Sequence, residues 1–315
     1  MGIAGGIRLE AAVSSYLALG AEVFAGGGVS LASIISRRVP CDGEYLEIDS
    51  LGAIPAVQEI VGSRRWGNVR AYVNRARVKR YGPDGLTFPI LKIVNDRTGL
   101  VSIEIANYLR ANADFMEKPI WDFLITNPTG IDGVAIISDS HPYAYGGSTW
   151  DNKTTNALSP AEFATGIEVM ESLRLENGEP AGYYPDTLMV GPSNRKMAID
   201  LTGADRIVPI AATGLEAYSS AVAAAGKTNW VGETPIKVVV NPRFVGSYAT
   251  NWLLLDTKKE QARPIIVGDA IAPQAIAITN PDSQGMADRS EARFYAEGQS
   301  ALMGGVPFGV YGLLA

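Results

Sequence analysis

The chain has 315 residues, of which 47 % are hydrophobic and 19 % charged, and its 33 acidic and 27 basic residues give a net charge of −6. This composition is typical of a globular protein with a sizeable core in one or two domains. The acidic balance excludes a general binder of nucleic acid or of anionic membranes. A single cysteine, Cys41, and a single histidine, His141, exclude an intrachain disulfide and most clustered metal sites.

Residues 1–44 are rich in glycine, alanine, serine and valine. They predict a short helix over Arg8–Leu19 and then a glycine-rich strap that includes Gly26–Gly28. Uncharged runs here are shorter than the about 20 residues of a membrane-spanning helix, so neither a membrane span nor a secretory signal is expected. We expect an arm that packs on neighbouring molecules and whose removal, over residues 1–30, leaves the subunit soluble.

The most basic part of the chain contains seven basic residues and no acid: Arg64, Arg65, Arg70, Arg75, Arg77, Lys79 and Arg80. Val69–Arg80 is rich in β-forming residues, Gly82–Gly85 has the chemistry of a tight turn, and Leu86–Val94 is typical of a second strand. The pattern predicts a long basic β-hairpin over about residues 65–95. Because an isolated two-stranded ribbon is at best marginally stable, this hairpin needs another surface to pack on.

Apolar residues at a spacing of three to four predict a long helix from Thr98 to Glu117, which Pro119 ends or kinks. A short buried strand is predicted at Val134–Ile137. A second unit starts at Ser159, where a capping serine, a proline and Glu162 mark a helix that continues to Asn177.

Shorter elements follow in the rest of the chain. We predict strands at Thr187–Val190, Ile236–Val240, Trp252–Leu255, Ile265–Val267 and Ala275–Ile278, a helix capped by Ser193 that runs to Leu201, and an alternating strand at Glu291–Leu302. Helices and strands alternate without a regular βαβ rhythm, which favours the α+β class.

A search for catalytic chemistry finds no active site. The glycine clusters lack the flanking pattern of a phosphate-binding loop. His141 could act as a base, but a structural role in a loop is favoured because no nucleophile motif accompanies it. We therefore predict no catalytic residue, no bound metal and no cofactor, and keep a hydrolase that uses His141 as a minor alternative.

Two ordered motifs resemble a known family. The segment Tyr45–Arg64 resembles the tyrosine, Leu-Gly, Pro, Glu and Gly-x-Arg pattern of the Mu-like major head subunit family of tailed phages. The segment Ile136–Pro142, with Asp139 and His141, is similar to that family's signature of apolar residues, aspartate and His-Pro. The later order of helices and strands is similar to the wider HK97-like capsid fold, so that the resemblance spans the chain from Tyr45 to its end.

The resemblance implies an α+β protein with the HK97-like capsid fold, in which the basic hairpin is the extended loop and the helix Thr98–Glu117 is the spine. The implied boundaries are an N-terminal arm at 1–44, the start of the peripheral domain with the extended loop at 45–97, the peripheral domain with the spine helix at 98–158, an axial domain at 159–284, and a C-terminal strand segment at 285–315 that returns to the peripheral domain.

The implied function is that of a major capsid protein without enzymatic activity. It would self-assemble into hexamers and pentamers of an icosahedral shell that encloses phage double-stranded DNA, in a virion assembled in the host cytoplasm. Its partners would be copies of itself, the packaged DNA without sequence-specific contacts, and portal, scaffold or decoration proteins, with no membrane. The alternatives are an encapsulin-type nanocompartment shell and a single-stranded nucleic-acid-binding protein that uses the basic hairpin.

Contacts between subunits are expected where the basic hairpin meets acids of an adjacent spine helix. The two-residue period of a strand places Arg75, Arg77 and Lys79 on one face. The candidate contact residues are Arg70, Arg75, Arg77, Lys79, Arg80, Glu104, Asp114 and Glu117.

Overall fold

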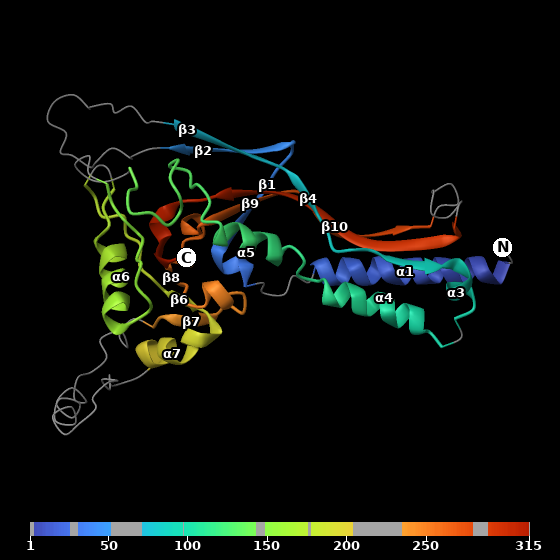
Figure 1. The fold of residues 1–315 in the computed structure, drawn as a ribbon. Helices are drawn as coiled ribbons and strands as arrows, with labels where there is room; N and C mark the ends of the chain where they lie inside the picture. The colour runs from blue at the N-terminus through green and yellow to red at the C-terminus, as the bar shows by residue number, and fades with distance from the viewer. Residues whose placement is uncertain are drawn as a thin grey trace, which may run out of the picture.

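The computed structural model describes residues 3–25, 31–51, 71–96, 98–142, 149–175, 178–203, 235–279 and 289–314. These residues form a five-stranded sheet, a four-stranded sheet and a two-stranded ribbon, with helices packed against the sheets (Figure 1). The mixture confirms the predicted α+β class. Within the described residues, no helix has both the length and the apolar character needed to cross a membrane.

The larger sheet is built on two long antiparallel strands, β9 (Ile265–Ile278) and β10 (Glu291–Gly304). Alternate residues along most of β10 are buried, as the alternating sequence predicts. Two shorter strands were expected where β9 runs, but the strand continues through Pro273. The register shifts opposite this proline, at Gly298, and such a bulge tolerates a residue without an N–H donor. On its other side β9 pairs in parallel with β1 (Ser36–Pro40).

The hairpin predicted over about residues 65–95 is wrong in its pairing. β4 (Lys79–Tyr81) and β5 (Leu86–Pro89) do not pair with each other, because both pair antiparallel with β10 and follow it in one direction. The intervening Gly82–Gly85 is therefore no chain-reversing turn. Its first glycine instead lets the backbone lie close to β10, since a Cβ there would stand 2.5 Å from the carbonyl oxygen of Ala296.

The two-stranded ribbon is formed by β2 (Tyr45–Leu51) and β3 (Ala71–Arg77), which pair antiparallel. The paired strands thus start at Tyr45, well before the predicted hairpin. Glu47 of β2 faces Arg75 of β3, and this pair of opposite charges favours the pairing. The connection at 52–70, which contains three of the predicted basic residues and most of the first motif, lies outside the described residues.

One face of the larger sheet is covered by helices that come from two parts of the chain. α1 (Ile3–Ala25) packs against β9, α3 (Ile90–Val94) and α4 (Leu100–Ala111). Their shared core contains Leu9, Ala12, Tyr16, Phe88, Ile93, Val101, Ile105, Leu109, Ala292 and Phe294. The short helix predicted at Arg8–Leu19 is part of the longer α1, and its apolar face is buried within its own subunit.

The predicted spine helix Thr98–Glu117 is too long, because α4 ends early and a separate helix, α5 (Glu117–Ile125), follows. The side chain of Asn112 donates a hydrogen bond to the carbonyl oxygen of Tyr108 (2.8 Å), which competes with continued helix. Pro119 does not end a helix. It lies in the first turn of α5, where its missing N–H has no helical partner to lose.

The second sheet has the strand order β11-β8-β6-β7. Its strands are β6 (Thr187–Val190), β7 (Lys237–Val240), β8 (Trp252–Leu255) and β11 (Val310–Leu313). The helices packed against it are α6 (Pro160–Ser172) and α7 (Arg195–Gly203). The predictions of β6, β7 and β8 are confirmed, and so is the cap of α6, where the Ser159 hydroxyl accepts from the Glu162 N–H (3.2 Å).

Three local predictions in this part of the chain are wrong. α6 ends at Ser172, earlier than expected. Ser193 does not cap α7, because its hydroxyl donates to the carbonyl oxygen of Ala249 (2.9 Å). Val134–Ile137 forms no strand, and only a single bridge at Ala135 pairs there. One-turn 3₁₀ helices lie at Pro192–Asn194, Gly246–Tyr248, Glu260–Ala262 and Pro307–Gly309.

A central core joins the two sheets. It brings together α2 (Ala32–Ile35) and α5 with β6 and β8 of one sheet and β9 of the other. Figure 1 shows the result: the long strands with α1 extend to one end of an elongated body, the second sheet with α6 and α7 forms the other end, and the ribbon extends away from α1.

Candidate functional site

The ribbon has an apolar face that packs on the larger sheet. Leu46 and Ile48 of β2 and Ala76 of β3 share a cluster with Ile266 of β9 and Met303 of β10. This contact supplies the surface that a two-stranded unit needs in order to be stable.

The opposite face of the ribbon is exposed and charged. Arg75 forms an ion pair with Glu47, and its guanidinium lies 5.1 Å from the centre of the Tyr45 ring. Arg77 Nη2 lies 2.8 Å from Glu44 Oε1. The arginines share a face, as the two-residue period predicts, but acids of the same chain already pair with them. Because all four charged side chains are at least half exposed, each pair contributes only about 0–1 kcal/mol.

The other predicted contact residues lie apart from the ribbon face. Arg80 Nε on β4 donates to Glu297 Oε2 (2.7 Å), and this hydrogen bond raises the pKa of Arg80. Glu104 is exposed on α4. Arg70 lies outside the described residues. The predicted set is therefore spread over several elements of the subunit.

A groove brings three of the predicted residues together. Lys79, Asp114 and Glu117 line a groove of about 890 Å³ between β4 and the connection from α4 to α5. Glu117 also accepts a hydrogen bond from the Ala32 N–H through Oε1 (3.4 Å). Glu104 is not part of the lining. The lining mixes charged and apolar side chains, which suits contact with the surface of another protein better than binding of a small ligand.

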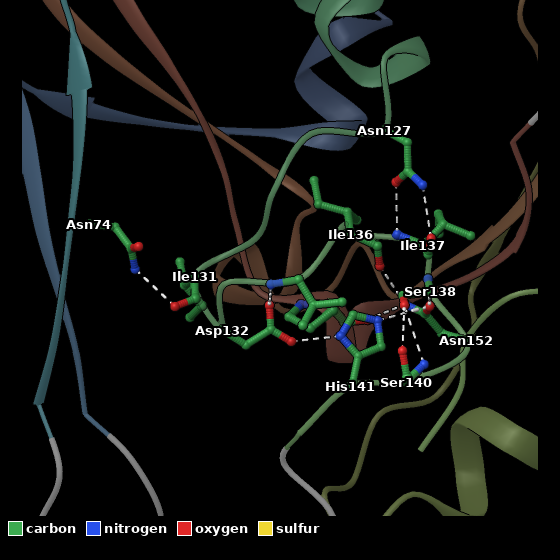
Figure 2. Close-up of polar contacts among 12 residues, drawn as sticks. Asn74, Asn127, Ile131, Asp132, Ile136, Ile137, Ser138, Ser140, His141 and Asn152 are labelled. Atoms are coloured by element: carbon green, nitrogen blue, oxygen red, sulfur yellow. Dashed lines mark hydrogen bonds and ion pairs between the residues drawn. The ribbon is translucent and has the colours of Figure 1, made fainter. Parts of the chain in front are cut away.

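Beneath the ribbon lies a loop, residues 128–136, which we call the supporting loop. Its Ile131 side chain joins the apolar cluster under the ribbon, and the Ile131 carbonyl oxygen accepts a hydrogen bond from Asn74 Nδ2 of β3 (2.9 Å; Figure 2). The loop lies directly on the end of β10: Ile131 N donates to the Gly305 carbonyl (3.1 Å), and a Cβ on Gly304 would overlap the backbone of Thr129. The loop thus connects the ribbon to the sheet.

A buried polar cluster of Asp132, His141 and Asn152 holds the supporting loop (Figure 2). Asp132 Oδ2 lies 2.6 Å from His141 Nδ1, and both side chains are fully buried. His141 Nε2 lies 3.1 Å from Asn152 Oδ1. The Trp150 ring stacks on the imidazole with 4.4 Å between ring centres. These contacts fix the loop from the side opposite to the ribbon.

This arrangement does not support the hydrolase alternative. Both ring nitrogens of His141 are engaged by Asp132 and Asn152, so neither faces a space that a substrate could enter. Among the described residues, no group of three or more His, Cys, Asp or Glu side chains could hold a metal ion. The contacts of His141 with Asp132 and Asn152 hold a loop in place and indicate no catalytic step. The structural role favoured for His141 is the one that these contacts indicate.

Sequence reasoning missed two members of this network, Asn74 and Asn152. Nothing in the sequence distinguishes them from other asparagines, because the groups to which their side chains donate lie in other segments of the chain. The acid that contacts the His141 ring is Asp132, and not Asp139, the aspartate of the second motif.

A family profile described as "phage capsid protein" matches residues 84–297, which is more than half of the chain. The chain belongs to the phage capsid protein family. No curated protein matches this capsid protein. The Mu-like branch, which the motifs resemble, is not singled out by the profile and stays an expectation.

Solved structures of phage capsids share the fold of this capsid protein. The procapsid of bacteriophage JBD30 matches with a TM-score of 0.53 and 13 % identity over 97 % of this chain and 74 % of that chain. The mature capsid of bacteriophage PhiM1 matches with a TM-score of 0.53 and 12 % identity over 91 % and 87 %. The JBD30 capsid decorated with minor capsid protein trimers gives 0.50 and 14 % over 68 % and 90 %.

These matches confirm the expected HK97-like fold. Together with the family, they identify a major capsid protein, a structural protein of the virion shell that assembles with copies of itself. The encapsulin and single-stranded nucleic-acid alternatives are not favoured.

Proposed function

We propose that this capsid protein forms hexamers and pentamers that close into an icosahedral head around double-stranded phage DNA, and that the shell assembles in the host cytoplasm. The ribbon carries this proposal: one face packs on its own sheet, and the other presents exposed charged and aromatic side chains. A surface of this kind suits a contact with a different surface of the next copy. Such head-to-tail contacts close into rings when the rotation between copies allows it.

We assign residues 1–44 to an N-terminal segment whose helix α1 packs on its own subunit and does not form a free arm. We assign 45–158 to the peripheral domain, 159–284 to an axial domain, and 285–315 to the returning C-terminal segment. Within the peripheral domain, the extended loop runs from Tyr45 to Arg77. This range is supported by the pairing of β2 with β3. α4 then takes the position of the spine helix.

The contact that we propose joins the basic side of one subunit to an acidic side of the next. Arg70, Arg75, Arg77, Lys79 and Arg80 would face Glu104, Asp114 and Glu117 of a neighbouring copy. The groove that contains Asp114 and Glu117 offers a concave surface for such a contact. Because the ribbon arginines already have partners in their own chain, they would share or exchange these partners on assembly.

Packaged DNA would contact the inner wall without sequence readout. The net charge of −6 suits this role, since a strongly basic wall would hold DNA through its phosphates. Portal, scaffold and decoration proteins are further partners that we propose for a shell of this type.

Charge reversal tests the ribbon contact. We expect the double variant Arg75→Glu, Arg77→Glu to fold but to lose most assembly, because the two introduced glutamates would repel the acids of a neighbour that the arginines attract. Electron microscopy and sedimentation of the purified protein measure the shells. The matched control is Arg38→Glu, which reverses another half-exposed arginine, paired with Asp269 (2.9 Å) away from the ribbon.

A charge swap separates a contact between subunits from a contact within the ribbon. Glu47→Arg with Arg75→Glu keeps an ion pair between the same two positions, so the ribbon should stay intact. We expect the swap to assemble poorly as well. Normal shells from the swapped protein would show that Arg75 acts only within its own chain, and would contradict the proposed contact.

A further inference from the structure

We infer that Asp132, His141 and Asn152 form a buried ion-pair cluster, with both ring nitrogens of His141 protonated, that positions the supporting loop and thereby sets how the ribbon docks. In this inference Asp132 and His141 are positioning residues. They act on the ribbon through the backbone of the loop.

The protonation of His141 Nε2 follows from the partners of Asn152. Asn152 Nδ2 donates to the carbonyl oxygens of Ile136 (2.7 Å) and Pro307 (3.1 Å). Asn152 Oδ1 accepts from the Ser138 N–H (2.8 Å). A flipped amide would place its NH₂ against this N–H and its oxygen against two carbonyls. The oxygen therefore faces His141, and Nε2 must donate to it.

The second ring nitrogen faces a carboxylate. Nδ1 lies 2.6 Å from Asp132 Oδ2, a short separation typical of a charge-assisted hydrogen bond. Asp132 Oδ1 accepts from the Val134 N–H (3.1 Å), so that the carboxylate is held by two donors. With both nitrogens donating, the ring is an imidazolium. The stacked face of Trp150 is also a favourable neighbour for a cation.

The covalent chain connects this cluster to the ribbon. The carbonyl that accepts the hydrogen bond from Asn74 belongs to the peptide bond between Ile131 and Asp132. If the Asp132 backbone moved because its side chain lost His141, the shared peptide plane would turn and the acceptor would point away from β3. It would also move the Ile131 side chain, which packs in the same cluster as Ile48 and Ala76. The buried pair thus orients both the polar and the apolar contact under the ribbon.

Nuclear magnetic resonance tests the protonation state. His141 is the only histidine of the chain, so its ring signals are unambiguous in ¹⁵N-histidine-labelled subunit. Near neutral pH we expect two slowly exchanging ring N–H protons. In Asp132→Asn we expect one of them to be lost, because a buried imidazolium without a counter-charge is unfavourable. A single ring N–H in the unsubstituted protein would overturn the imidazolium.

Hydrogen exchange of the dispersed subunit tests the link to the ribbon. Asn74→Ala removes one hydrogen bond outside the buried cluster, and we expect it to raise exchange of the β2 and β3 amides roughly three- to tenfold. Asp132→Asn should raise the same amides by at least as much. The amides of β6 and β8 serve as an internal reference for global unfolding. Asn112→Ala is the matched control, because it also removes a hydrogen bond from an asparagine side chain to a backbone carbonyl, but at the end of α4 and away from the ribbon.

Two results would contradict the positioning role. One is unchanged ribbon exchange in Asn74→Ala. The other is an equal rise of ribbon and reference amides in Asp132→Asn. The consequence for shell assembly rests on the proposed function, whereas the exchange measurement does not. Normal shells from a variant with an unprotected ribbon would therefore count against the proposed ribbon contact and leave the positioning role standing.

Discussion

Arg77 and Glu44 pair in water, whereas Asp132 and His141 pair with no solvent access. Water weakens the pair of Arg77 and Glu44, and if one partner were removed, water would solvate the other. In the second pair, removal of one partner leaves a buried group without its counterpart, which is far more costly than the pair itself is worth. Burial therefore decides which of these residues matters for folding.

We expect His141→Ala to lower the free energy of unfolding by about 3–5 kcal/mol, because it leaves the Asp132 carboxylate buried and unpaired. Arg77→Ala should lower it by about 0–1 kcal/mol. Urea unfolding followed by circular dichroism measures both. Similar losses for the two variants would show that the buried cluster is not as closed to water as its burial indicates.

Asp96 provides a test that depends on pH. Its carboxylate accepts backbone hydrogen bonds from Val101, Thr98 and Gly99 and caps the start of α4. These bonds, the one from Val101 first, lower the pKa of Asp96 below the ordinary 3.8. A lowered pKa means that its contribution is complete above the ordinary value and is lost as the pH falls through the folded value.

We therefore expect the first amides of α4 to lose protection as the pH falls below about 3.8, because protonation of the Asp96 carboxylate weakens its hydrogen bonds to them. Asp96→Asn keeps an acceptor but cannot titrate, so its helix start should show no such step. Hydrogen exchange resolved by mass spectrometry measures both proteins. An identical acid step in the variant would assign the loss to another group.

At the scale of elements, the docking of α1 on β9 depends on the absence of one side chain. Gly20 faces Ala275, and a Cβ at Gly20 would overlap the Cβ of Ala275. Glycine inside a helix is usually unfavourable by about 0.5–1 kcal/mol relative to alanine. Here close packing outweighs that preference.

Gly20→Ala should therefore destabilise the subunit, although the same change in an exposed helix would stabilise it. The double variant Gly20→Ala, Ala275→Gly moves the methyl group across the interface and should recover most of the loss. Thermal unfolding of the single and double variants provides the measurement. A stabilised single variant would mean that α1 does not pack on β9 at this point.

For the whole molecule, the N-terminal segment has a different role from the one expected of an arm. Leu9, Ala12 and Tyr16 of α1 are buried in a core that they share with β10 and α4. The Tyr16 hydroxyl also donates to the Tyr295 carbonyl oxygen (2.6 Å), and burial raises the pKa of this phenol. α1 is therefore part of the body of its own subunit.

Deletion of residues 1–30 should consequently destabilise the isolated subunit and expose the apolar surface of α4 and the larger sheet. This replaces the expectation that the subunit stays soluble without its arm. Size-exclusion chromatography and thermal unfolding of the truncated protein give the answer. A soluble monomer with an unchanged unfolding temperature would show that the contacts of α1 contribute little.

Predictions from local patterns succeeded where neighbouring residues carry the information. The cap at Ser159, the strand at Trp252–Leu255 and the alternation of β10 all follow from a few adjacent side chains. Gly82–Gly85 misled the prediction because glycine serves both turns and close backbone approaches, and the partner that distinguishes them, β10, is more than two hundred residues away.

The sequence by itself determined the α+β class, the family resemblance and the absence of a catalytic motif, because composition, periodicity and ordered motifs are local properties. Tertiary structure alone decided that β3 pairs with β2, that α1 completes its own subunit, and that Asp132 meets His141 and Asn152. The physical reason is that pairing partners and buried polar networks depend on which distant segments share a surface. The type of a single residue does not reveal which distant segment it will contact.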